Sequence, residues 1–197
     1  LRDRPVCIFV GGVRGEEAIT LVQAMNTGHT TLSTMHAAAV QTVINRLDNE
    51  PINVPRSMVQ SLDVLCVQTL ARFGSERVRR ADTIAEIEGI DQRTGELDYT
   101  GAYRWDSSSD SFDEGTTRLM DEIRDERGWS KTDLLEEMRQ RRHFLEFLWD
   151  REVDGYEQFT AMVNQYYAAP EEVMERIEAA ESGADPTAKA QTSGAGD

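Results

Sequence analysis

Lysine is almost absent from this 197-residue sequence: Lys131 and Lys189 occur, and every other basic side chain is arginine. Acidic residues outnumber basic ones by 36 to 21, which gives a net charge of −15. Such a surface repels phosphate backbones and anionic lipids, so nucleic-acid and membrane-surface partners are disfavoured. An acidic surface with so little lysine favours adaptation to concentrated salt, which screens self-repulsion. An ordinary acidic cytosolic protein is the alternative.

Cysteine is scarce, and no Cys-x-x-Cys pair or other metal-ligand spacing occurs, so the sequence predicts no metal site. Cys7 and Cys66 both stand in apolar runs, which predicts two buried free thiols in a reducing, cytoplasmic compartment. No apolar run approaches the roughly 20 residues of a membrane span, and the sequence shows no signal peptide. The first residue is Leu1, and a core strand follows almost at once. We therefore expect a piece of a longer polypeptide without a transmembrane segment.

Strand and helix patterns alternate over the first half of the chain. The continuous apolar run 6–10 predicts a strand buried on both faces, as in parallel sheets. Further elements are expected by the same reasoning: strands at 30–34 and 64–70, and helices at about 16–28, about 38–51 and shortly after 55. Two longer strands, 77–90 and 96–105, are expected to form a hairpin that turns at Gly95. This order predicts an α/β fold, with helices packed on a parallel sheet.

The second half is helical in pattern. A polar loop at 107–115 predicts a linker, 116–181 a helical subdomain, and 182–197 a disordered tail. Ser130 and Asp133 resemble a capping box, and Pro170 is expected to open the last helix. An aromatic stripe is expected to form the core of this subdomain, with a docking surface for a membrane protein as the alternative: Trp149, Tyr156, Phe159, Tyr166 and Tyr167.

Three short motifs stand close together near the start of the chain. They read Gly-Gly-Val-Arg-Gly-Glu-Glu-Ala at 11–18, Gln-Ala-Met-Asn-Thr-Gly-His at 23–29 and Ser-Thr-Met-His-Ala at 33–37. In order and spacing they resemble the Walker B motif and histidine box of the type II/IV secretion ATPase superfamily. The match is nearest to the archaeal motors that assemble archaella and type IV pili. The resemblance is close up to about Trp105 and looser over the helical end.

The resemblance implies a fold and partners. It implies that 1–106 is the C-terminal half of a RecA-like P-loop NTPase sheet with a β-hairpin, followed by a small helical bundle. It also implies a homo-hexamer that acts on the cytoplasmic side of a membrane platform protein, with ATP and Mg²⁺ as cofactors. The protein moved, whether archaellin, pilin or another, does not follow from the sequence.

The same resemblance assigns site residues. Gly11 and Gly12, in the turn after the Walker B strand, would bind the nucleotide. His29 and His36 would sense or contact the γ-phosphate, His29 as a nucleotide-binding residue and His36 as a catalytic one. Arg14 would face the nucleotide or a neighbouring subunit; an exposed arginine at a helix start is the alternative. Thr34 is expected as a hydroxyl partner at the strand end, or else as a core β-branched residue.

Two departures from the family pattern predict that the chain alone does not hydrolyse ATP. Gly12 stands where the family has the glutamate that aligns water against the γ-phosphate. Glu17 matches a second family acid and is the expected catalytic acid, although it could replace that glutamate only if the backbone moved. No Gly-x-x-x-x-Gly-Lys-Ser/Thr phosphate loop occurs in the sequence, and the family's phosphate loop would precede Leu1.

Three hypotheses about function therefore remain open. The chain is a C-terminal portion of a secretion or pilus-assembly ATPase, or it is a catalytically dead paralogue that joins a hexamer as an interaction subunit. Alternatively, the part does not fold stably alone, because the missing half would cover one face of its sheet.

A basic cluster interrupts the acidic sequence after the third strand: Arg72, Arg77, Arg79 and Arg80. It predicts either a contact with an acidic neighbouring subunit or nucleotide, or a solvated strand end.

Overall fold

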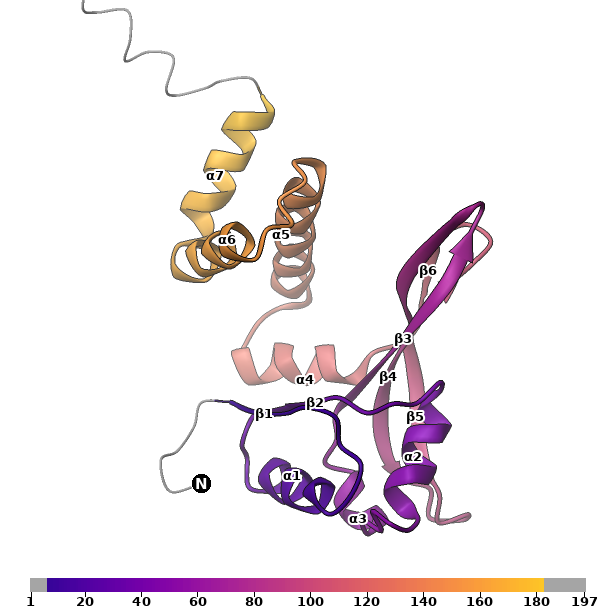
Figure 1. Ribbon diagram of the computed structural model, residues 1–197. Coiled ribbons are helices and arrows are strands. Elements are labelled where there is room, and N and C mark those ends of the chain that lie inside the picture. The colour runs from indigo at the N-terminus through magenta and orange to yellow at the C-terminus, as the bar shows by residue number, and fades with distance from the viewer. Residues whose placement is uncertain (1–6, 183–197) are drawn as a thin grey trace, which may run out of the picture. The chain divides into compact units, whose positions relative to one another are not determined.

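The structure is a computed structural model that describes residues 7–182, and the chain divides into two compact units between Ile123 and Arg124. The first unit contains two sheets and several helices, and the second is helical (Figure 1). The predicted mixed α/β class is therefore confirmed. The predicted tail, 182–197, lies outside the described residues except for Ser182.

The elements of the first unit alternate at first and then form a run of strands. In chain order they are β1 (Ile8–Val10), α1 (Glu17–Asn26), β2 (Thr31–Ser33), α2 (Val40–Asp48), α3 (Arg56–Val59), β3 (Val64–Phe73), β4 (Glu76–Ile90), β5 (Leu97–Asp106), β6 (Ser111–Glu114) and the start of α4 (Arg118–Arg127).

The strands β1 and β2 pair in parallel, with Phe9 opposite Leu32. These two side chains are 69% and 58% exposed, whereas Val10, on the other face, packs against the core. The prediction that strand 6–10 is buried on both faces is therefore wrong for its described residues. The physical reason is that the described elements cover only one face of the β1–β2 pair.

The strand β3 does not join β1 and β2, although the sequence predicts one parallel sheet. Instead β3, β4, β5 and β6 form a four-stranded antiparallel sheet in that order. Only Gly74 and Ser75 separate β3 from β4, and Gly74 adopts a left-handed φ of 58°. A two-residue turn of this kind closes an antiparallel hairpin locally, which accounts for the difference.

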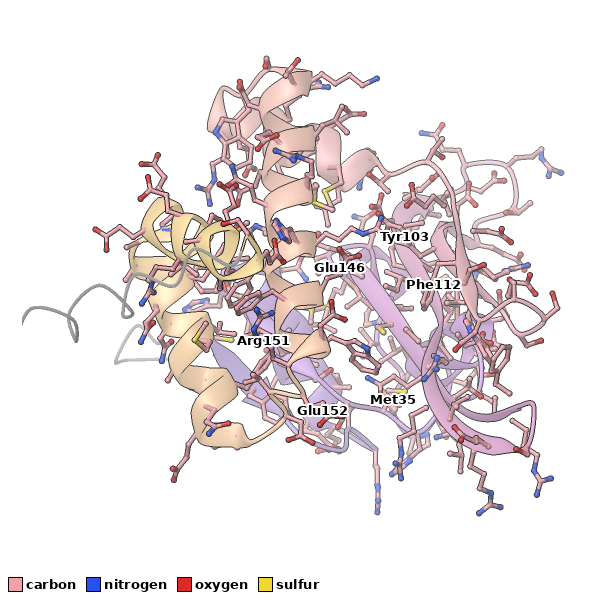
Figure 2. All side chains as sticks on the ribbon, turned by 90° about the horizontal axis from the view of Figure 1, so that it is seen from above. Met35, Tyr103, Phe112, Glu146, Arg151 and Glu152 are labelled. Carbon is pink, nitrogen blue, oxygen red and sulfur yellow. The ribbon has the colours of Figure 1, made fainter. Side chains whose placement is uncertain are left out.

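The predicted linker 107–115 is a hairpin between β5 and β6. Its acidic residues organise the turn: Asp106 accepts hydrogen bonds from Ser108 and Ser109, and Asp110 accepts them from the Arg80 guanidinium and from Trp105 Nε1 at 2.7 to 2.8 Å. The prediction of a linker is wrong for 111–114, which form β6, and these side-chain hydrogen bonds hold the turn between the two strands. Tyr103 and Phe112, which are labelled in Figure 2, lie on the two strands of this hairpin.

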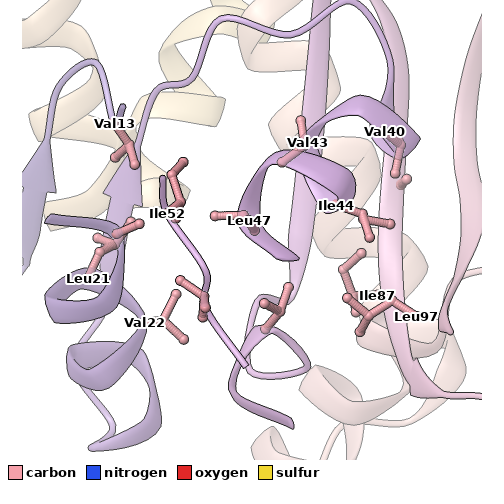
Figure 3. Packing of buried hydrophobic residues seen from close by; sticks show 14 of the residues in the cluster. Val13, Leu21, Val22, Val40, Val43, Ile44, Leu47, Ile52, Ile87 and Leu97 are labelled. Atoms are coloured by element: carbon pink, nitrogen blue, oxygen red, sulfur yellow. The ribbon is translucent and has the colours of Figure 1, made fainter. Parts of the chain in front are cut away.

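The hydrophobic core of the first unit lies between its helices and the inner end of the antiparallel sheet. Val22 from α1, Ile44 and Leu47 from α2 and Ile87 from β4 are at most 6% exposed (Figure 3). Their 3.6-residue and 2-residue spacings follow the helix and strand patterns of the sequence. This core fixes α1, and with it the loop that precedes α1, to the rest of the unit.

One buried charge ties the sheet to α4. Glu86 in β4 is 6% exposed, and its carboxylate accepts hydrogen bonds from the backbone N–H groups of Arg118 and Leu119 at 2.8 and 3.2 Å. These are two of the donors that a helix leaves unsatisfied at its N-terminus. A carboxylate there also interacts favourably with the helix dipole. Glu86 thus caps α4 from a distant strand.

The second unit contains the end of α4 and three further helices: α5 (Lys131–Asp150), α6 (Tyr156–Ala168) and α7 (Pro170–Glu181). The predicted capping box at Ser130 and Asp133 and the helix start at Pro170 are both confirmed. Phe144, Tyr166 and Ile177 belong to a small buried cluster, in which the first two rings stack at 4.6 Å.

The aromatic stripe of the second unit is mostly not in this core. Tyr166 is 5% exposed, as predicted for a core residue. The other four members of the stripe have exposed fractions of 40% to 83%: Phe159, Tyr167, Trp149 and Tyr156. The core prediction is therefore wrong for them, since one face of each helix suffices to bury the small cluster.

Two further observations bear on the composition. Cys7 and Cys66 are free thiols but exposed, so their predicted burial is wrong; Cys7 precedes β1, and Cys66 lies on the uncovered face of β3. Within residues 7–182, every helix is too short or too polar to cross a membrane.

Candidate functional site

The candidate site forms where β1 and β2 end. Parallel pairing brings the carboxyl ends of the two strands to the same edge, so the turn after Val10 meets the turn after Ser33. The N–H of Gly12 donates to Thr34 Oγ1 at 2.8 Å, and the N–H of Val13 donates to the Thr34 carbonyl at 2.8 Å. The Walker B-like and histidine-box-like motifs are therefore joined by direct hydrogen bonds.

Thr34 is exposed and uses its hydroxyl to bind the neighbouring turn. It is therefore a strand-end hydroxyl partner rather than a core residue. Gly11 is also exposed, and Gly12 is half-buried with a φ of 68°, the left-handed region that favours glycine. A Cβ placed on Gly12 would meet no atom within 4 Å. Backbone conformation, not lack of space, opposes a glutamate at this position.

Glu17 holds the loop that follows Gly12. Its Oε1 atom accepts hydrogen bonds from the N–H groups of Arg14 and Gly15, at 2.6 and 3.0 Å. These backbone hydrogen bonds, led by the one from Arg14, lower the pKa of the Glu17 carboxyl. The carboxylate therefore folds back onto its own loop at the start of α1.

The hydrogen bonds of Thr34 and Glu17 together occupy every backbone donor from Gly12 to Gly15. A phosphate group needs such donors free and pointing outward. In this conformation the turn supplies none of them, and a phosphate would have to displace either Glu17 or Thr34.

Two cationic or ionisable side chains remain available at this edge. Arg14 and His36 are both exposed. The Arg14 guanidinium interacts electrostatically with Glu17, and neither side chain forms a hydrogen bond or salt bridge with residues 7–182. His36 lies two residues beyond Thr34, whose hydroxyl binds the Gly12 turn. These are the groups that could approach an anionic ligand here.

His29 lies at the opposite end of β2. It precedes the strand. Thr34 is five positions further along the chain, which is about 16 Å in an extended conformation. Its Nδ1 lies 3.0 Å from the Thr27 hydroxyl, which also contacts the carbonyls of Gln23 and Ala24. The His29 ring is thus hydrogen-bonded to the C-terminal turn of α1. The structure thus joins Gly12 and Thr34 at one end of β2, with His36 two residues further along the chain, and leaves His29 at the other end.

His29 instead borders a cavity of about 460 Å³. The cavity is also lined by residues of the α3–β3 connection, among them Ser61 and Asp63, and by Leu119 of α4. Sequence reasoning missed these neighbours. No local pattern could have identified them, because the packing of α1 against α3 brings the two segments together.

The described residues fit the family-implied cofactors only in part. Arg14 and His36 could interact with phosphate oxygens of ATP. Mg²⁺ prefers carboxylate and other oxygen ligands, but Gly12 has no side chain and Glu17 is engaged with its own loop. Within residues 7–182 no three side chains of His, Cys, Asp or Glu gather to hold a metal ion. These residues do not form a Mg²⁺ site.

Comparison with known proteins gives two family matches and several relatives. A family model described as type II/IV secretion system protein matches residues 1–127, and one described as PilB3-like, C-terminal, matches 108–190. Two relatives are uncharacterized proteins of Methanocaldococcus jannaschii. MJ1287 is 35% identical over 84% of this chain and 62% of its own length, and MJ0900 is 33% identical over 85% and 31%. The chain thus spans less than two thirds of the length of each of these relatives.

Proposed function

Because the chain belongs to the type II/IV secretion system protein family, we propose that it carries the Walker B and histidine-box part of a secretion or pilus-assembly ATPase. In the complete motor, ATP hydrolysis would drive protein export or the assembly of a type IV pilus or archaellum. The observation that supports this best is the direct hydrogen bonding between the Gly12 turn and Thr34, which unites the two family motifs at one sheet edge.

The proposal extends to the setting of the protein. β1 and β2 would belong to a RecA-like sheet, and the chain would act in a hexamer on the cytoplasmic side of a membrane platform protein. The acidic, lysine-poor composition supports a halophilic source. ATP with Mg²⁺ is the cofactor of the proposed motor, and metal binding there requires groups other than the described residues.

The chain by itself is proposed to be inactive. It carries no phosphate-loop sequence, its turn donors are occupied, and Gly12 cannot orient water. Electrostatic and water-positioning groups of this kind each contribute about 10²–10³-fold or more to a rate. We expect no ATP turnover from the unmodified chain in molar salt.

Replacing Gly12→Glu tests whether the missing glutamate alone accounts for the expected inactivity. It should create no activity, and it should lower Tm, because glutamate at a φ of 68° costs about 1 kcal/mol or more. Phosphate release and thermal unfolding, measured on both chains in the same salt, check both expectations. Turnover by the unmodified chain would refute the proposed inactivity.

The occupied strand-end donors also support a second candidate, a non-catalytic subunit that joins intact copies. Mixing the chain with a longer relative that contains a phosphate loop distinguishes the two roles. Co-elution together with a changed ATPase rate supports a subunit role, and absence of association supports a part that works only within its own longer polypeptide.

Histidine variants sharpen the mixing experiment. If the strand-end edge faces nucleotide, His36→Ala should abolish the effect of the chain on the rate of the mixture. His29→Ala, at the other end of β2, is the matched control and should change that effect less. An equal loss in both variants would contradict a role for this edge alone.

A further inference from the structure

Three arginines share one face of the β3–β4 hairpin. In the antiparallel register Arg72 lies opposite Arg77, and Leu70 lies opposite Arg79. Opposed residues, and residues two apart on one strand, project to the same side of a sheet. All four side chains are exposed, and Leu70 is 58% exposed. We call Leu70, Arg72, Arg77 and Arg79 the arginine face; the hairpin that carries it is a long ribbon in Figure 1.

The fourth member of the basic cluster has a different role. Arg80 lies on the opposite side of the hairpin and forms a two-pronged ion pair with Asp110, through Nε and Nη2, both at 2.7 Å. The cluster seen in the sequence is therefore divided by the strand periodicity. One arginine stabilises the fold, and the other three form no ion pair with residues 7–182.

The arginine face is unfavourable for folding by itself. Like charges directly opposite each other on neighbouring strands are destabilising, and Arg72 and Arg77 stand in that relation. None of the three guanidinium groups has a carboxylate within ion-pair distance among residues 7–182, although acids outnumber bases by 36 to 21 in the chain. Uncompensated local conflicts of this type are expected at functional surfaces.

We propose that the arginine face binds an extended, carboxylate-rich segment of another protein. The guanidinium fork is shaped to bind a carboxylate through two parallel hydrogen bonds. Arg77 and Arg79 are two residues apart on one strand, or about 6.6 Å, which is also the spacing of alternate residues in an extended segment. A segment with acids at alternate positions therefore presents its carboxylates in step with the arginines, and Leu70 offers an apolar contact beside them.

The charge of the whole chain selects this partner over two others. Three arginines on a protein with a net charge of −15 form a small positive area. A bilayer or a nucleic acid meets a wide surface and is repelled by its acidic surroundings. A single extended segment touches only the positive area.

The test uses the full chain and a fluorescent ten-residue peptide of alternating glutamate and serine, with binding followed by anisotropy at 0.15 and 1 M salt. The same peptide with glutamine in place of glutamate is the neutral probe. We expect binding of the glutamate peptide only. The triple variant R72Q/R77Q/R79Q should weaken it at least tenfold.

The control variant R46Q/R93Q/R104Q removes the same charge from exposed arginines elsewhere and should change binding less than twofold. R72K/R77K/R79K keeps the charge and should bind at an intermediate strength, since lysine lacks the fork. Circular dichroism verifies folding of each variant. The proposal would be overturned if the two triple glutamine variants bound the peptide equally weakly, or if the unmodified chain did not bind it. Preferential binding to phosphatidylglycerol vesicles would also overturn it.

Discussion

The charged side chains of the two units find their partners in different ways. In the first unit, Arg56 pairs with Asp48 eight residues away and Arg80 pairs with Asp110 thirty residues away, beside one local pair of Arg118 with Glu122. In the second unit, three arginines of α5 pair with glutamates three or four residues away in the same helix. Pairs of the second kind contribute about 0.3–0.5 kcal/mol. Charge therefore joins separate elements more often in the first unit and acts mainly within one helix in the second, although His143 there also contacts Glu181, 38 residues away.

The hydrophobic cores of the two units also differ, in size and in the elements that they join. The core of the first unit joins helices to the antiparallel sheet, whereas the second unit buries one small cluster around Phe144 and Tyr166. The hydroxyl of Tyr166 has no hydrogen-bond partner there, and burial raises its pKa. We expect the second unit to be the less stable of the two.

The largest effect should come from core truncation. Ile87→Ala in β4 and Leu148→Ala in α5 both remove a side chain that is 2% exposed, at a cost of about 2–5 kcal/mol each. Hydrogen exchange, which reports the two units separately, should show lost protection only in the unit that carries the change. Loss of protection in both units from Leu148→Ala would mean that the two units unfold together, and would contradict the expected difference in their stability.

An intermediate effect is expected at the α4 cap. Glu86→Ala removes the acceptor of two backbone donors, which should cost about 1–3 kcal/mol in urea unfolding. Glu86→Gln keeps an oxygen acceptor and should cost less. Asp133→Ala in the capping box of α5 is the matched local cap in the second unit. A Glu86→Ala effect below that of Asp133→Ala would contradict the importance of distant contacts in the first unit.

The smallest effect concerns pH. Hydrogen bonds from Arg80 and then Trp105 lower the pKa of Asp110 from 3.8 to about 2. Because the folded pKa is depressed, this stabilisation is present above about pH 4 and is lost as the pH falls towards 2. Asp110 has a left-handed φ of 52°, which asparagine also tolerates. Asp110→Asn should therefore flatten the dependence of Tm on pH over that range.

Glu136→Gln, in a local pair of α5, is the control for the pH prediction. Arg139 lowers the pKa of Glu136 as well, but the pair is exposed and formed within one helix. We expect a smaller change in the Tm profile between pH 2 and pH 6. An equal change in both variants would remove the distinction between local and distant ion pairs.

The sequence predicts best what neighbouring residues decide. The capping box at Ser130 and the helix start at Pro170 both follow from short patterns. At the candidate site the family resemblance names the residues, and parallel strand pairing accounts for which of them meet. The assignment of His29 and His36 to nucleotide remains a prediction.

What the sequence does not predict depends on partners far along the chain. The exposure of Phe9 reflects which elements cover the β1–β2 pair, and a strand pattern alone cannot reveal it. The β5–β6 hairpin depends on Arg80 reaching Asp110, thirty residues away. The use of Glu17 as a loop clamp was likewise hidden, because a carboxylate reads as catalytic in this motif until its hydrogen bonds are seen.

The Glu17 clamp has a consequence for how such motifs change over evolution. A chain that has lost ATP hydrolysis would still lose loop stability if it lost Glu17, so folding alone suffices to retain an acid at this position. Gly12, with its left-handed backbone, has no comparable structural reason to become a glutamate. Within one short motif, the two positions can therefore change independently. Folding alone can retain an acid at position 17, whereas only the need to position water would favour an acid at position 12.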